Sequence, residues 1–164
     1  MHQPFFQRTV LETSFDFVSA RPRILFEYWK QKCGTRPRPR FDEIDLMDLY
    51  EIAPYIVVKD VIDGGEDFAM RFRGTGVRHT VGIEGTGKTA KDLYSGNNRE
   101  HINEAFKEVI RTEKSVRMLG RVSVDPEKDY LVYEGVHLPL DDGAGNISRL
   151  ISAYTFGIDE NDLG

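Results

Sequence analysis

Apolar and polar positions recur with two different periods along the chain, and each period predicts a type of element. Over residues 98–114 the apolar side chains recur three and four positions apart, which is the spacing of one face of an α-helix. Over residues 66–73 they recur at every second position, which is the spacing of a strand with one buried face. We therefore expect a long amphipathic helix that packs on a sheet. The apolar face of this helix consists of Ile102, Ala105, Phe106, Val109 and Ile110.

The remaining pattern predicts two further helices and four further strands. A helix over 19–33 has Ser19 at the position of an N-cap and Gly34 at its C-terminal stop, and a short helix follows Asp45. Residues 1–18 show little periodicity and predict no regular element. The further strands are expected at 55–62, 117–124, 130–138 and 147–156.

The order of these elements indicates the fold class. A helix and a short helix come first, then two strands, a glycine-rich stretch, the long helix and three strands. Asp63-Gly64-Gly65 links the first two strands with residues typical of a hairpin turn. Runs of strands without alternating helices favour an antiparallel sheet with helices on one face. The pattern therefore predicts an α+β fold of five strands, to which the helix over 19–33 is added.

Composition is that of a single soluble domain. The chain has 164 residues, 40% of them hydrophobic, and its net charge of −5 argues against general nucleic-acid binding. The longest obvious apolar stretch, residues 55–58, is far too short to span a membrane, and no apolar leader begins the chain. Cys33 is the single cysteine, which excludes an internal disulfide and a multi-cysteine zinc site. We expect a cytoplasmic protein that uses neither nucleic acid nor membrane as a partner.

Charge is unevenly divided over the first half of the chain. Residues 21–40 carry seven arginines or lysines and one acid, whereas residues 41–67 carry nine acids and one lysine. Pro37 and Pro39 prevent a helix at the end of the basic segment and predict an extended linker. Two interpretations fit the asymmetry: a basic arm that lies against an acidic face of its own or a neighbouring domain, or a basic site for an acidic partner.

Five local sequence features, together with the order of the elements, resemble one protein family. The features are Tyr28-Trp29, Arg38-Pro39-Arg40-Phe41-Asp42, Asp45-Leu46 to Pro54, Phe68-Ala69-Met70-Arg71-Phe72-Arg73-Gly74-Thr75, and Tyr133-Glu134-Gly135 with Leu138-Pro139-Leu140-Asp141-Asp142-Gly143. They resemble the short stand-alone PAS-like proteins of α-proteobacteria over about residues 20–158. This resemblance implies a PAS-like five-stranded antiparallel sheet, with the long helix across its concave face and a cavity between them.

The resemblance also implies a division of the chain and a role for it. Residues 1–40 are expected to form an N-terminal arm and helix with the Arg/Pro linker, residues 41–158 the PAS-like domain, and residues 159–164 an acidic tail. Domains of this kind act as sensors and docking modules, usually as dimers, and the motifs of this branch imply no particular ligand. We expect a non-enzymatic sensory or regulatory module that binds a small ligand and signals through contacts with a protein partner. A ligand-free structural adaptor is a second hypothesis.

Apolar positions of the long helix and of the strands are the candidates for lining the cavity. They are Phe68, Met70, Phe72, Val77, Leu93, Phe106, Val109, Ile110, Met118, Tyr133 and His137. A filled core explains the same pattern, so both interpretations stay open. A second apolar stripe, on the helix over 19–33, either covers the outer face of the sheet or pairs with a second copy in a homodimer. This stripe consists of Ile24, Leu25, Tyr28 and Trp29.

Eight of the 15 glycines fall between residues 64 and 96, and this stretch contains a phosphate-loop pattern. Residues Gly82–Thr89 match G-x-x-x-x-G-K-[ST] in full, with Lys88 and Thr89 at the positions that contact phosphate and Mg²⁺ in such loops. A working loop needs a buried strand before it and a helix after it, and the surrounding residues predict neither well. A nucleotide-binding or phosphotransfer protein is therefore the competing hypothesis. Glycines that form turns along the wall of a PAS cavity explain the stretch without it.

The remaining residues assign no cofactor and no catalytic group. His101 lies in the first turn of the long helix, where we expect it to face water, and no pair of histidines has the spacing of metal ligands. A photosensory flavin site needs a cysteine in the glycine-rich region, whereas Cys33 lies in the first helix. Haem and flavin are therefore not expected, and the identity of any small-molecule ligand stays open. No nucleophile has a base placed beside it, so we expect no enzyme.

Overall fold

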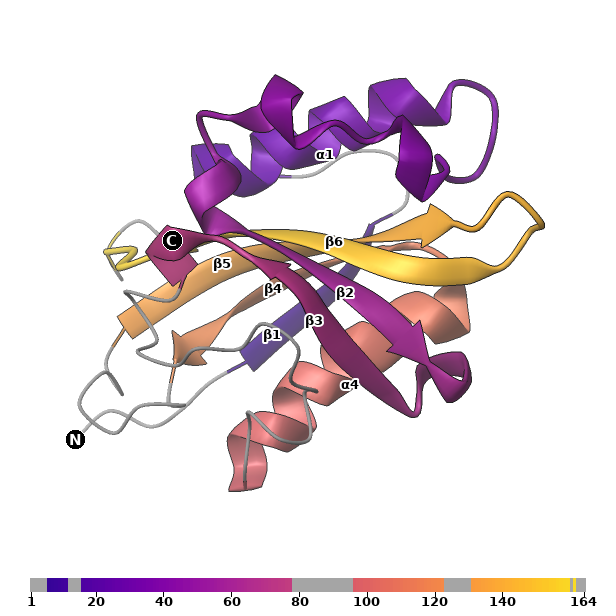
Figure 1. Cartoon of the computed structure of the whole chain (residues 1–164). Helices are drawn as coiled ribbons and strands as arrows, with labels where there is room; N and C mark the ends of the chain where they lie inside the picture. Colours follow the sequence, from indigo (N-terminus) through magenta and orange to yellow (C-terminus); the bar gives the residue numbers. More distant parts are fainter. Residues whose placement is uncertain (1–5, 12–15, 78–95, 123–130, 160, 162–164) are drawn as a thin grey trace.

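One antiparallel sheet with the strand order β1-β4-β5-β6-β2-β3 forms the centre of the protein. The structure is a computed structural model, and it describes residues 6–11, 16–77, 96–122, 131–159 and 161. Helix α1 lies on one face of the sheet and helix α4 on the opposite face (Figure 1). The elements are β1 (Phe6–Leu11), α1 (Ala20–Cys33), β2 (Ile56–Ile62), β3 (Asp67–Arg73), α4 (Gly96–Thr112), β4 (Ser115–Val122), β5 (Leu131–Asp141) and β6 (Ile147–Phe156).

The predicted α+β fold is confirmed, with six strands in the sheet rather than five. The additional strand is β1, which pairs antiparallel with β4 at one edge of the sheet. Its sequence, Phe-Gln-Arg-Thr-Val-Leu, does not alternate between apolar and polar residues, so periodicity did not predict a strand. An edge strand is held by main-chain hydrogen bonds to a single neighbour, and these bonds leave no mark on the side-chain pattern.

Both faces of the sheet are covered, by α4 on one side and by the added helix α1 on the other. The inner strand β6 buries apolar side chains on both of its faces: Leu150 packs on the α4 side and Ile151 on the α1 side. A sheet that is apolar on both faces needs a cover on each of them. Phe106 of α4 and Trp29 of α1 belong to the two separate apolar clusters that result.

A buried glutamate of the sheet holds the start of α1. The carboxylate of Glu134, on β5, accepts hydrogen bonds from the backbone N–H groups of Val18 at 3.0 Å and Ser19 at 2.9 Å, and from the Ser19 hydroxyl at 2.5 Å. Arg117 Nε of β4 lies 2.7 Å from Oε2 of this carboxylate and balances its charge. Ser19 therefore stands at the predicted N-cap position, but its side chain binds the sheet instead of the amides of its own helix.

A bulge in β3 reverses the direction of its side chains. Lys59 of β2 lies opposite Met70, whereas the preceding Val58 lies opposite Phe72, so Arg71 is the extra residue between them. Alternate residues of a strand point to opposite faces, and one extra residue exchanges the faces. Met70 accordingly packs on the α4 side, and Phe72 on the α1 side.

A run of 3₁₀ turns crosses the outer face of the sheet between α1 and β2 (Figure 1). The expected capping by Asp45 is present, since its side chain accepts a hydrogen bond from the backbone N–H of Met47 at 2.9 Å. The turn between β2 and β3 is also 3₁₀ and links antiparallel strands, as the hairpin prediction requires. The turns are η1 (Phe41–Glu43), η2 (Leu46–Leu49), η3 (Ala53–Tyr55) and η4 (Asp63–Gly65).

Arginines of the basic segment pair with acids of the same chain. Arg36 Nη1 lies 2.6 Å from Glu43, and Arg40 Nε lies 3.0 Å from Asp42. The buried Arg38 reaches across to β5, where its Nε lies 2.9 Å from Asp141. These contacts favour the first of the two interpretations of the charge asymmetry, in which the arm lies against acids of its own domain.

Candidate functional site

Nine of the eleven residues predicted to line a cavity lie together between α4 and the sheet. Seven of them belong to one buried cluster, Ile110 packs at its edge, and the ring of His137 packs against Phe106. Phe72 does not join them, because the bulge in β3 turns it to the α1 side. Leu93 lies outside the described residues. The seven clustered residues are Phe68, Met70, Val77, Phe106, Val109, Met118 and Tyr133.

Lys59 of β2 is the chemically unusual residue of this region. Its side chain is 0% exposed. The Nζ atom donates a hydrogen bond to Ser152 Oγ at 2.6 Å and lies 4.3 Å from the centre of the Phe106 ring. Within the part of the chain that the structure describes, no carboxylate forms an ion pair with this ammonium group. A buried charge without a counter-ion costs several kcal/mol, so the position of Lys59 calls for a functional explanation.

Ser152 links Lys59 to His137. The Ser152 Oγ atom lies 2.6 Å from Nδ1 of His137 as well as from Nζ of Lys59. A hydroxyl has one proton to donate, so the assignment that satisfies all three groups has Ser152 donating to an unprotonated Nδ1, with the ring proton on Nε2. The ring of His137 meets Phe106 edge to face, with 5.0 Å between the ring centres. Lys59, Ser152 and His137 thus form a hydrogen-bonded row across β2, β6 and β5.

Burial lowers the pKa of both basic groups in this row. Loss of water lowers the pKa of the Lys59 ammonium well below its ordinary value of 10.5, and the charge of Arg73 lowers it further. Burial likewise lowers the pKa of His137 well below 6.5, with a contribution from Lys59. An anion placed against Nζ would favour the charged form of Lys59. Whether Lys59 is protonated therefore depends on the groups that lie beside its Nζ atom.

Lys59 is not among the residues predicted from the sequence, although its position carries a signal. Val57 and Val61 stand two residues before and after it, so Lys59 lies on an apolar side of its strand. A lysine in a strand normally faces water, and that was the natural interpretation of Lys59. The position becomes informative only once both faces of the sheet are known to be covered.

The other chemical candidates take no part in this arrangement. The phosphate-loop pattern at 82–89 and the side chain of His101 lie outside the described residues. Cys33 is buried in α1 on the opposite side of the sheet, and burial raises the pKa of its thiol. Among the described residues, no three or more potential metal ligands gather into one group. No helix in the described part of the chain has the length and apolar character needed to cross a membrane.

The apolar stripe of α1 that was predicted for docking lies largely against the sheet. Leu25 and Trp29 are buried, and Trp29 Nε1 donates a hydrogen bond to the Pro139 carbonyl at 2.9 Å. Tyr28 is half-buried and Ile24 is 36% exposed. The stripe therefore covers the outer face of the sheet, which is one of the two roles expected for it. Its second expected role, in a homodimer, stays a prediction.

Solved structures of light-oxygen-voltage proteins have a similar fold. An RNA-binding light-oxygen-voltage receptor is 15% identical, with a TM-score of 0.56 over 98% of this chain and 40% of that chain. A light-oxygen-voltage domain studied with a flavin analogue is 14% identical, with a TM-score of 0.51 over 71% of this chain and 85% of that chain. The present chain thus spans 40% of the length of the first structure. At such low identity the likeness concerns the fold alone.

Sequence comparison places the chain in a family. No curated protein is significantly similar to it in sequence. The family model of the PAS domain matches residues 18–155, a range that includes α1, α4, strands β2 to β5 and all of β6 except Phe156. The predicted family is confirmed, while the narrower resemblance to α-proteobacterial proteins stays a prediction. The chain belongs to the PAS domain family.

Proposed function

We propose that this PAS domain is a sensory or regulatory module that binds a small ligand between α4 and the sheet and signals through contacts with a partner protein. The ligand carries a carboxylate or another strong hydrogen-bond acceptor. Membership in the PAS family supports the sensory role. The observation that carries the ligand proposal is the fully buried Lys59, whose single hydrogen bond within the described residues goes to Ser152.

Lys59 has donors to spare for such a ligand. A charged ammonium group has three N–H donors, of which Ser152 accepts one. The face of the Phe106 ring, 4.3 Å from Nζ, attracts the charge only weakly compared with an oxygen acceptor. A ligand oxygen would take the place of this ring and form charge-assisted hydrogen bonds with Nζ. It would also supply a negative charge beside Lys59, with which no carboxylate of the described residues forms an ion pair.

Ligand binding at Lys59 provides a route from the core to the surface. Phe106 belongs to α4, so displacement of its ring changes how this helix packs on the sheet. Lys107 and Arg111 on the same helix are exposed. A shift of α4 therefore alters a surface that a protein partner contacts. A ligand-free adaptor would have no such change to transmit.

Native mass spectrometry of protein purified without added ligand tests the proposal. We expect the wild-type spectrum to contain a bound acidic small molecule, whose occupancy falls at least about tenfold in Lys59→Met, because a hydrogen bond to a charged group contributes about 1.5–3 kcal/mol. Lys107→Met removes an exposed lysine of α4 and serves as the matched control. Equal occupancy in Lys59→Met, or no added mass in any sample, would overturn the proposal. Bound nucleotide that depends on Lys88 would instead support the competing hypothesis.

A further inference from the structure

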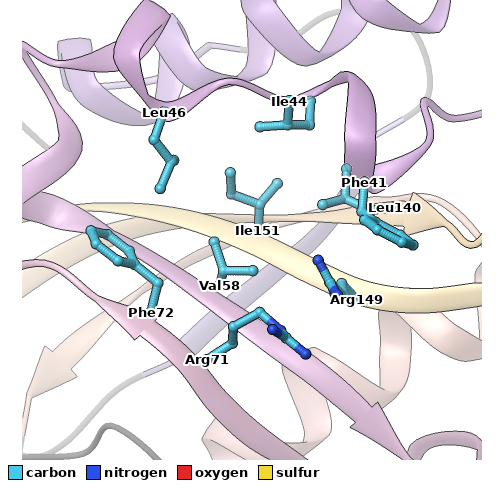
Figure 2. A pocket seen from close by; sticks show the side chains of 9 residues that line it. All are labelled: Phe41, Ile44, Leu46, Val58, Arg71, Phe72, Leu140, Arg149 and Ile151. Carbon is cyan, nitrogen blue, oxygen red and sulfur yellow. The ribbon is translucent and has the colours of Figure 1, made fainter.

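A hollow lies on the face of the sheet opposite α4, beneath the 3₁₀ turns that follow α1. Its volume is about 250 Å³. Ile44 and Leu46 form one wall, and Val58 and Ile151 rise from the strands that form the floor (Figure 2). The lining is apolar except for two arginines. It consists of Phe41, Ile44, Leu46, Val58, Arg71, Phe72, Leu140, Arg149 and Ile151.

The two arginines of this pocket share one acidic partner. Arg71 Nε lies 2.8 Å from Asp60 Oδ1, and Arg149 Nε lies 3.1 Å from the same oxygen atom. Two positive charges therefore face one negative charge. The Arg149 guanidinium also lies over the ring of Phe41, with 3.9 Å from Cζ to the ring centre. This stacking restrains one of the two guanidinium groups at the pocket.

Both guanidinium groups keep free donors. Each contact with Asp60 uses Nε, and in the part of the chain that the structure describes the Nη groups of Arg71 and Arg149 make no hydrogen bond. Pairs of guanidinium N–H groups match the geometry of a carboxylate. The pocket thus offers one unbalanced positive charge and several unused donors next to an apolar hollow.

We propose that this pocket is a binding site for a small monocarboxylate with an aliphatic tail. The carboxylate accepts hydrogen bonds from the Nη groups of Arg71 and Arg149, and the tail lies between Ile44, Leu46 and Ile151. A cavity of about 150 Å³ holds a benzene ring, so a volume of about 250 Å³ holds roughly ten non-hydrogen atoms. Octanoate has that size and that chemistry. The sheet separates this pocket from Lys59, so the two proposals stand independently.

Titration of the labelled protein with octanoate, followed by methyl NMR, tests this site. We expect saturable shifts of the Ile44, Leu46 and Ile151 methyl signals, with affinity at least about tenfold weaker in Arg71→Met and in Arg149→Met, since each removes a charge-assisted bond. Octan-1-ol, which has the tail without the charge, is expected to bind at least about tenfold more weakly than octanoate. The exposed Arg111 on α4 supplies the matched control, Arg111→Met, which leaves octanoate binding unchanged.

Three outcomes would overturn the proposal of a carboxylate site in this pocket. One is the absence of saturable binding at about 1 mM octanoate, the weak end of specific affinities. Another is equal affinity of the wild type and both arginine variants, provided that their spectra show the native fold. A third is binding whose shifts fall on the α4 side, at Val109, instead of the pocket. Lys59→Met is expected to bind octanoate normally, so failure of this proposal is distinguishable from failure of the proposed function.

Discussion

Lys59 makes the stability of this domain depend on pH in a way that Lys59→Met should remove. Burial lowers the pKa of this ammonium in the folded protein well below 10.5, whereas in the unfolded chain it keeps its ordinary value. Between these two pKa values the unfolded chain binds more protons, so the free energy of unfolding rises with pH. Above pH 10.5 Lys59 is mostly uncharged in both the folded and the unfolded state. The free energy of unfolding then falls as the pH drops from 10.5 toward the folded-state pKa of Lys59.

The size of this effect follows from the linkage of one proton. A single group contributes a slope of about 1.4 kcal/mol per pH unit within that window. Methionine has a similar length without the charge, and Ser152 keeps His137 as its partner. We therefore expect Lys59→Met to be more stable than the wild type at neutral pH. The difference should shrink as the pH approaches 10.5.

Urea unfolding at a series of pH values measures both slopes. The fluorescence of Trp29, the single tryptophan, reports unfolding because this side chain is buried. Lys107→Met, which changes an exposed lysine, is expected to follow the wild-type curve. Parallel curves for the wild type and Lys59→Met would refute the reasoning, because they would mean that Lys59 binds the same number of protons in both states.

Two further substitutions test contacts that hold the fold. Glu134→Gln removes the charge that Arg117 balances and weakens the hold on the start of α1, so we expect a loss of about 3 kcal/mol in urea unfolding; an unchanged stability would show that these bonds add nothing. Gly74→Ala would place its Cβ 2.2 Å from the backbone oxygen of Pro54, and we expect a loss of about 3 kcal/mol, since the backbone must move. Thermal unfolding measures this loss, and wild-type stability would contradict the close approach.

Local structure was predictable to the extent that the side-chain pattern alone determines it. The strand expected at 147–156 is found over the same residues, and the helix expected at 19–33 begins one residue later. Phe68 and Met70 share a face, as their alternation indicates, but Phe72 does not. The bulge that separates them depends on how β2 and β3 pair, which no property of either strand alone reveals.

The chemistry of both candidate sites depends on contacts between distant parts of the chain. Lys59 is unusual only because α4 covers its face of the sheet and because Ser152, 93 positions away, is its hydrogen-bond partner. The unbalanced charge near the pocket on the α1 side arises where Arg71 and Arg149 meet Asp60 from different strands. The amino-acid composition gives the number of charged residues, but it does not show which of them lie together in the folded protein. The core residues were predictable, and the polar groups within and beside the core were not.

A crystal structure of the protein purified from its own cells without added ligand tests the central claim most directly. We expect non-protein density within hydrogen-bond distance of Lys59 Nζ, between α4 and the sheet, with the ring of Phe106 moved away from the ammonium group. If the Phe106 ring still covers Lys59 and no ligand atom lies within hydrogen-bond distance of Nζ, the account of Lys59 as the ligand-binding residue is contradicted.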